Sequence, residues 1–144
     1  MSSATLIDDG LLLRLVRDGL SPTSAPEPFC STTGFWFRLA RATVAPAGRG
    51  RFSQAVAELE PRDRTLVRSR VEQLDRLVRI ADVRGLVVGM ARLASTYGLN
   101  VLAAEVLAAA LMFEARIVVT HGNVGPRLVA AAEAVGVELT ELAP

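Results

Sequence analysis

The chain has 144 residues, 51% of them hydrophobic and 22% charged, with a formal net charge of +1. This composition excludes a disordered chain, and the length allows one domain with a single core but not two. No apolar run reaches the roughly 18 to 20 uncharged residues of a membrane-spanning helix, the N-terminus lacks a basic signal region, and Cys30 is alone. We therefore expect a cytoplasmic protein without membrane segments or internal disulfides.

The first half of the chain predicts one strand followed by helices. Residues 4–7 are an apolar strand, and Asp9 is a natural N-cap for a helix that closes near Gly19. Prolines and small polar residues predict a loop at about 21–34, and a second loop is expected at about 46–51. Further helices are expected over residues 35–45, 52–59 and 61–77.

Strands and helices alternate in the second half. Strands are expected at 77–83, 116–120 and 137–139, and helices at 84–97, from Asn100 to 113, and from Pro126 to 135. Such alternation predicts a single α/β domain over residues 1–144, with three layers and a short, mainly parallel sheet covered by helices on both faces.

Glu105 is the only charged residue in LNVLAAEVLAAALMF, residues 99–113. A helix without a polar face packs on several sides, so this carboxylate needs a partner, a metal or a proton. Alternatively, Glu105 reaches solvent near the start of its helix, where the helix dipole favours an anion.

Acidic and polar residues follow two of the expected strands. Asp8 and Asp9 end the first strand, and His121 and Asn123 follow the strand at 116–120. If these strands are neighbours, their carboxyl ends share one edge of the sheet, and the intervening helix can aim Glu105 at it. Carboxylates gathered there would need a divalent cation, and oxygen ligands suit Mg²⁺ or Mn²⁺.

Two stretches, TLIDDGLLLRLV and GLNVLAAEVLAAALMFEARIVVT, resemble the opening strand and the late helix and strand of the PIN-domain family. That family includes ribonuclease toxins of bacterial toxin–antitoxin pairs. The resemblance implies catalytic Asp8 and Glu105, with Asp9 as an additional acid, and metal ligands at Asp8, Asp9, Glu105 and Asn123.

The chain departs from this family at three acids. Glu105 stands where aspartate is usual, and Gly122 or Asn123 replaces the acid after the strand-ending threonine. The helix that carries the second family acid reads TTGFWFRLARA here, with Arg38 and Arg41 instead of a carboxylate.

Charge is unevenly distributed along the chain. Residues 38–79 hold ten arginines and five acids, and the chain contains no lysine. This clustering favours an anionic partner, although a solvated helix face is the alternative. Candidate RNA-binding residues are Arg38, Arg41, Thr120 and His121. The aromatic run at 35–37 would stack a base or, more simply, belong to the core.

Three functions remain open from the sequence. One is an Mg²⁺- or Mn²⁺-dependent ribonuclease that cleaves RNA phosphodiesters, as the resemblance implies. The second is a catalytically degenerate PIN-fold module that binds nucleic acid or a protein. The third, a small-molecule-binding α/β domain, has no supporting fingerprint. Expected partners are RNA, an antitoxin protein and a second copy of this chain, because GLVVGMARLA offers more apolar helical surface than one small sheet covers.

Overall fold

The structure is a computed structural model that describes residues 4–18, 28–44 and 51–143, without the side chains of residues 51–53. The expected helix end at Gly19, most of the first loop (residues 21–27) and most of the second loop (residues 46–50) lie outside the described residues.

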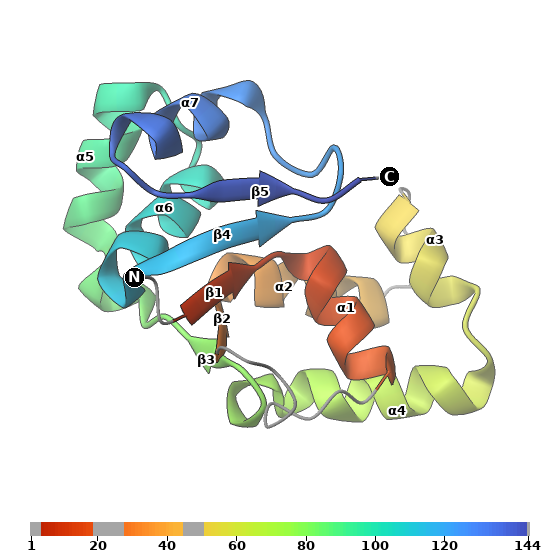
Figure 1. Cartoon of the computed structure of the whole chain (residues 1–144). Coiled ribbons are helices and arrows are strands. Elements are labelled where there is room, and N and C mark those ends of the chain that lie inside the picture. Colours follow the sequence, from red (N-terminus) through yellow and green to blue (C-terminus); the bar gives the residue numbers. More distant parts are fainter. Residues whose placement is uncertain (1–3, 19–27, 45–50, 144) are drawn as a thin grey trace.

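A five-stranded, wholly parallel sheet forms the centre of the domain (Figure 1). The strands are β1 (Ala4–Ile7), β2 (Phe29–Ser31), β3 (Arg79–Ile80), β4 (Ala115–Val119) and β5 (Leu139–Glu141), in the order β3-β2-β1-β4-β5. β1 is entirely buried and pairs with β4 from Ala4–Ala115 to Ile7–Val118. The α/β class is confirmed, and so is the adjacency of the two strands whose ends carry the acidic and polar residues.

Strand β2 corrects the sequence prediction, because it lies within the stretch 21–34 that was expected to be a loop. It has only three residues, too few for a periodic hydrophobic signal, and it directly follows Pro28. The strand expected at 77–83 is reduced to Arg79–Ile80, and the last strand begins at Leu139 instead of 137.

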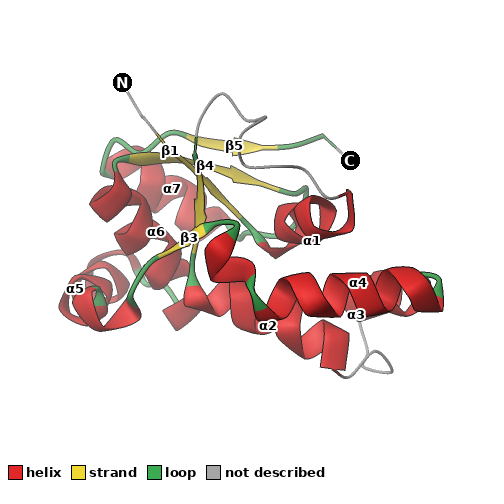
Figure 2. Cartoon of the chain, turned by 90° about the horizontal axis from the view of Figure 1, so that it is seen from below, coloured by secondary structure: helices red, strands yellow, loops and turns green. Residues whose placement is uncertain are grey.

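The helices gather on two sides of the sheet. They are α1 (Asp9–Asp18), α2 (Thr33–Val44), α3 (Arg51–Ala57), α4 (Pro61–Glu72), α5 (Val87–Tyr97), α6 (Val101–Phe113) and α7 (Pro126–Ala134), with 3₁₀ turns at Leu74–Arg76 and Val83–Gly85. Helices α5, α6 and α7 lie on one side of the molecule and α1 to α4 on the other (Figures 1 and 2). The helix expected over 61–77 is shorter in the structure: α4 ends at Glu72, and a 3₁₀ turn follows at Leu74–Arg76.

The helix starts show which capping predictions hold. The side chain of Asn100 accepts a hydrogen bond from the Ala103 N–H (2.8 Å) and caps α6, the helix that was expected to begin at Asn100. For α1 the cap is Asp8 rather than Asp9: Asp8 Oδ1 accepts from the Leu11 N–H (3.0 Å), and its carbonyl accepts from Leu12. Asp9 stands in the first turn of the helix, so consecutive acids take different positions.

Helices α5 and α6 carry most of the exposed large apolar side chains. No residue of α5 is buried, and the exposed set on the two helices is Val87, Val88, Val101, Leu111 and Met112. The expected homodimer stays a prediction, and this is the surface it would cover. In the described part of the chain no single helix is long and apolar enough to cross a membrane, although α5 and α6, bent by 117° at their junction, pass that test as a pair.

Candidate functional site

The carboxylate of Asp8 lies at the carboxyl end of β1 and is completely buried. Its Oδ1 accepts the helix-capping bond from Leu11. Its Oδ2 accepts three hydrogen bonds, from the Thr120 N–H (2.8 Å), the Thr120 hydroxyl (2.7 Å) and the Asn123 amide (2.7 Å). Asp8 thus ties the end of β1 to the end of β4, and both of its oxygens are used inside the protein.

Asp9 is 2% exposed and shares the same amide. Asn123 Nδ2 donates to Asp9 Oδ1 at 2.7 Å, and the guanidinium of Arg38 on α2 lies 3.0 Å from Asp9 Oδ2 in an ion pair. The Nε–H of Arg38 does not point along a hydrogen bond, so Asp9 Oδ2 is held by charge alone. Burial raises the pKa of Asp9, while Arg38 and Asn123 act in the opposite direction.

The orientation of the Asn123 amide follows from its neighbours. Its Nδ2 faces two carboxylates, and its Oδ1 accepts from Arg38 Nη2 at 3.3 Å. Turning the amide over would place its oxygen against Asp8 and Asp9 and its NH₂ against the guanidinium. Asp8, Asp9, Asn123 and Arg38 therefore form one network, which we call the acid–arginine network.

Gly10 allows α1 to begin this close to β4. A Cβ on Gly10 would lie 2.7 Å from Thr120 Cγ2 and 2.9 Å from Thr120 Oγ1, far inside van der Waals contact. Its own N–H donates to Asp9 Oδ1 (3.1 Å). The sequence DDG thus supplies two buried carboxylates, Asp8 and Asp9. The glycine that follows them leaves room for the side chain of Thr120 at the end of β4.

Glu105 has a different set of partners. It is 4% exposed, its Oε1 accepts from the N–H of Gly34 at 2.9 Å, and the neighbouring N–H of Thr33 in the first turn of α2 also favours the charged carboxylate. The Thr32 hydroxyl accepts from the next N–H, that of Phe35 (3.1 Å). Glu105 therefore caps α2 from another helix, which supplies the partner that the sequence required.

Glu105 remains partly unsatisfied in this position. Its Oε2 is buried without a hydrogen-bond partner, and burial raises the pKa of the carboxyl group although the two backbone donors lower it. A Cβ on Gly34 would lie 2.5 Å from Glu105 Oε1, so a larger residue here would push the carboxylate away from its present position.

The expected three-carboxylate metal centre is not assembled in the described residues. No group of three or more His, Cys, Asp or Glu side chains there has an arrangement that would hold a metal ion. Asp8, Asp9 and Asn123 do meet, but the Asn123 oxygen faces Arg38, and Glu105 is bonded to α2. A divalent cation would have to displace the guanidinium and turn the amide, so these residues as arranged do not fit a bound metal.

Beside the acid–arginine network lies an open cavity of about 590 Å³ at the carboxyl end of the sheet. Asp9 is the one carboxylate among its lining residues, and it is already paired. The basic lining residues are Arg14 and Arg17 on α1, Arg38 on α2, and His121. The other lining residues are small, polar or apolar: Gly10, Leu13, Ala55, Thr120, Gly122 and Asn123. We call this cavity the arginine pocket, because three arginines line it and its one carboxylate, that of Asp9, is paired with Arg38.

The other predicted RNA-binding residues occupy varied positions. Arg41 is exposed on α2. His121 lines the arginine pocket and lies 3.3 Å from Glu141 Oε1, which also accepts from the Gly122 N–H. The hydroxyl of Thr120 donates to Asp8, so its proton is already used.

Several arginines of the 38–79 cluster join parts of the fold instead of forming one surface. Arg68 donates to the carbonyl of Thr43 (3.1 Å), Arg70 donates to the carbonyl of Val16, and Arg79 lies 5.0 Å over the ring of Phe113. The sequence missed Arg14 and Arg17, because their spacing is that of the polar face of any amphipathic helix. Only the position of α1 beside β4 brings them to the site.

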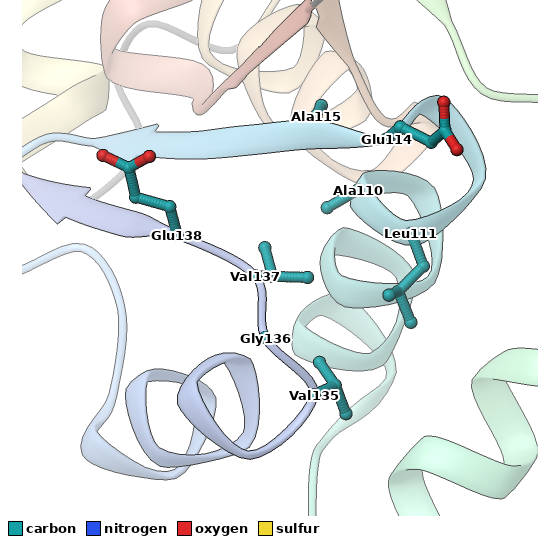
Figure 3. Close-up of a pocket in the computed structure, with 8 residues that line it drawn as sticks. All are labelled: Ala110, Leu111, Glu114, Ala115, Val135, Gly136, Val137 and Glu138. Atoms are coloured by element: carbon teal, nitrogen blue, oxygen red, sulfur yellow. The ribbon is translucent and has the colours of Figure 1, made fainter. Parts of the chain in front are cut away.

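A second cavity, of about 440 Å³, lies at the opposite end of β4 (Figure 3). Ala110, Val135 and Val137 face one another across it, whereas the carboxylates of Glu114 and Glu138 point away from them. It lacks the convergent polar groups of a binding site, and it lies away from the carboxyl ends of the strands. The arginine pocket is therefore the better candidate.

Cys30 lacks the environment of a nucleophilic cysteine. Cys30 is buried in β2, and burial raises the pKa of its thiol to about 12. Such a thiol stays protonated at neutral pH, whereas a nucleophilic cysteine needs its thiolate.

No protein-family model matches this chain, and neither does any curated protein sequence. The resemblance to PIN domains is therefore carried only by the motifs quoted above and stays a prediction.

Replacing Gly10 by alanine should destabilise the fold by roughly 1–3 kcal/mol, because the added methyl group collides with Thr120 and disturbs its bonds to Asp8. The matched control is Gly89→Ala in α5, where a Cβ meets nothing within 4 Å. The control should gain up to about 1 kcal/mol from helix propensity. Urea unfolding of both variants measures the difference, and equal effects of the two substitutions would contradict the close approach.

Replacing Glu105 by glutamine should remove one source of pH dependence. Because its pKa is raised in the folded protein, the folded state binds this proton more tightly than the unfolded chain. The free energy of unfolding then rises as the pH falls from above the folded pKa toward the ordinary pKa of glutamate. Glu105→Gln keeps an acceptor for Gly34, so it should be at least as stable as the wild type at neutral pH, with a weaker rise toward acid.

Urea unfolding between about pH 5 and 8 tests this expectation. Glu133→Gln, an exposed change on α7, is the control and should follow the wild type. A Glu105→Gln protein that is less stable at neutral pH, with the wild-type slope, would show that the ionised carboxylate is favourable in the fold.

Proposed function

We propose that this chain is a PIN-like domain whose acidic site is neutralised from within and which binds the phosphate backbone of RNA without cleaving it. The observation that carries the proposal is the ion pair of Arg38 with Asp9, 3.0 Å apart, beside the Asn123 amide that donates to both aspartates. The guanidinium thus supplies the positive charge that a metal cation would otherwise provide, and the amide supplies hydrogen bonds to both buried carboxylates.

The arginine pocket supports phosphate as the ligand. Its accessible cationic side chains are those of Arg14, Arg17 and Arg38, and its single carboxylate is 2% exposed. Planar guanidinium groups match phosphate oxygens in paired hydrogen bonds. Arg17 also pairs with Asp18 on the surface (3.0 Å), an exposed contact that a phosphate can outcompete at little cost.

A second candidate, the Mg²⁺- or Mn²⁺-dependent ribonuclease, is favoured by one observation. Asp8 and Asp9 are adjacent buried carboxylates that share one amide nitrogen, so their oxygens are close enough to approach the same ion. This function requires Arg38 to leave Asp9. The antitoxin partner that the resemblance implies remains part of the proposal, and so do the homodimer and the cytoplasmic location that composition and apolar helix surface predict.

Titration of a labelled RNA oligonucleotide at several salt concentrations tests the proposal. Affinity should fall with salt by about 0.7 log units per log unit of salt for each phosphate neutralised. Arg14→Ala and Arg17→Ala should each weaken binding and reduce that slope by about 0.7. Arg92→Ala, which removes one exposed charge from α5, is the matched control and should change neither.

The same RNA, incubated with Mg²⁺ or Mn²⁺, should remain intact. Cleavage that depends on metal and is lost in Asp8→Asn would support the ribonuclease instead. Absence of binding at low salt, or an equal loss of affinity in Arg92→Ala, would overturn the assignment of the arginine pocket to RNA.

A further inference from the structure

Phe37 stands out on the helix that carries Arg38. Its side chain is 64% exposed, and it is the only aromatic among the exposed large hydrophobic side chains of the described residues. The two aromatic residues before it pack in the core. Phe35 is 1% exposed, and Trp36 donates from Nε1 to the carbonyl of Val71 at 2.8 Å. The run FWF therefore does not belong to the core as a whole.

The position of Phe37 relative to the arginine pocket follows from helix geometry. At 3.6 residues per turn, successive residues are about 100° apart, so Arg41 lies between Arg38 and Phe37 around the axis of α2. Arg38 reaches into the pocket, while Arg41 and Phe37 are exposed. Phe37 and Arg41 are also neighbours along the helix, four residues apart. Arg38, Arg41 and Phe37 thus follow one another around α2, from the arginine pocket to the exposed ring of Phe37.

We infer that Phe37 is a stacking platform for an unpaired base, and that the ligand of the arginine pocket is a single-stranded nucleic acid. The inference rests on the proposed function, because it places the phosphate of the same nucleotide segment at Arg38 and Arg41. Exposed aromatic rings beside a cationic track are the means by which proteins hold single strands, since every base has a π-face. In a duplex the bases are stacked on one another and offer no free face to Phe37.

The surface of α2 provides a control within the same helix. Val44 is 69% exposed and lies seven residues after Phe37, close to the same face. Val44→Ala removes apolar surface without removing an aromatic ring. Phe37→Leu keeps an apolar side chain of similar reach and removes the ring. Since both side chains are exposed, the fold should survive these changes, which thermal melts verify.

The experiment compares a labelled single-stranded oligonucleotide with an abasic strand of equal length, which keeps the phosphates and lacks the bases. Phe37→Ala and Phe37→Leu should weaken binding of the intact strand by about tenfold or more and leave binding of the abasic strand unchanged. Val44→Ala should leave both unchanged. Arg38→Ala and Arg14→Ala should weaken both ligands alike. RNA and DNA versions identify the sugar, and a duplex should not respond to Phe37.

The outcomes separate the two proposals. If neither strand binds, the arginine pocket is not a nucleic-acid site and the proposed function fails. If both strands bind but the Phe37 variants match the wild type, the pocket binds phosphate and the stacking platform is refuted. An equal loss in Phe37→Ala and Val44→Ala would show that apolar area, and not the ring, is what matters.

Discussion

The burial of two consecutive carboxylates at the end of β1 is the constraint on which the rest of the site depends. Asp8 is fully buried and Asp9 is 2% exposed, and a buried ionised carboxylate without partners costs several kcal/mol, roughly. The neighbouring elements supply hydrogen-bond donors and a positive charge to these two carboxylates. The start of α1 donates the Leu11 N–H, the end of β4 donates through Thr120, the following turn supplies Asn123, and α2 presents Arg38. The positions of four elements are thereby coupled to two side chains.

In this arrangement the two aspartates are buried, whereas Arg14 and Arg17 are exposed to solvent. The acids lie underneath, held by an amide and a guanidinium, and the arginines of α1 and α2 line the opening above them. A partner that arrives from solvent therefore meets cationic groups first, although two aspartates occupy the strand end. The same sheet edge that gathers acids in the sequence thus presents arginine side chains at the cavity, because Asp9 is paired with Arg38 inside the fold. Glu105 on α6 serves a related purpose at the start of α2, where it accepts a hydrogen bond from the Gly34 N–H.

The sequence predicted the α/β class, the adjacency of β1 and β4, and the meeting of Asp8, Asp9 and Asn123, because buried β-branched strands and the polar turns after them leave a local signal. It did not predict β2, which is too short for periodicity, or the partner of Glu105, because Gly34 is 71 residues away and offers only a backbone N–H. Arg14 and Arg17 looked like an ordinary polar helix face, whereas Arg68, Arg70 and Arg79 were counted with a basic surface although they hold carbonyls and a ring. Contacts distant in sequence decide these roles.

Thermal melting with EDTA, Mg²⁺ or Mn²⁺ tests most directly whether Arg38 takes the place of a cation. The wild type should melt at the same temperature in all three conditions. Arg38→Ala should be less stable in EDTA, since Asp9 loses its charge partner, and should be restored by the divalent ions, by about 2.7 kcal/mol at 100 times their dissociation constant. Arg41→Ala, an exposed change one turn away, should behave as the wild type. A wild-type protein stabilised by Mg²⁺ or Mn²⁺ as strongly as Arg38→Ala would contradict the account.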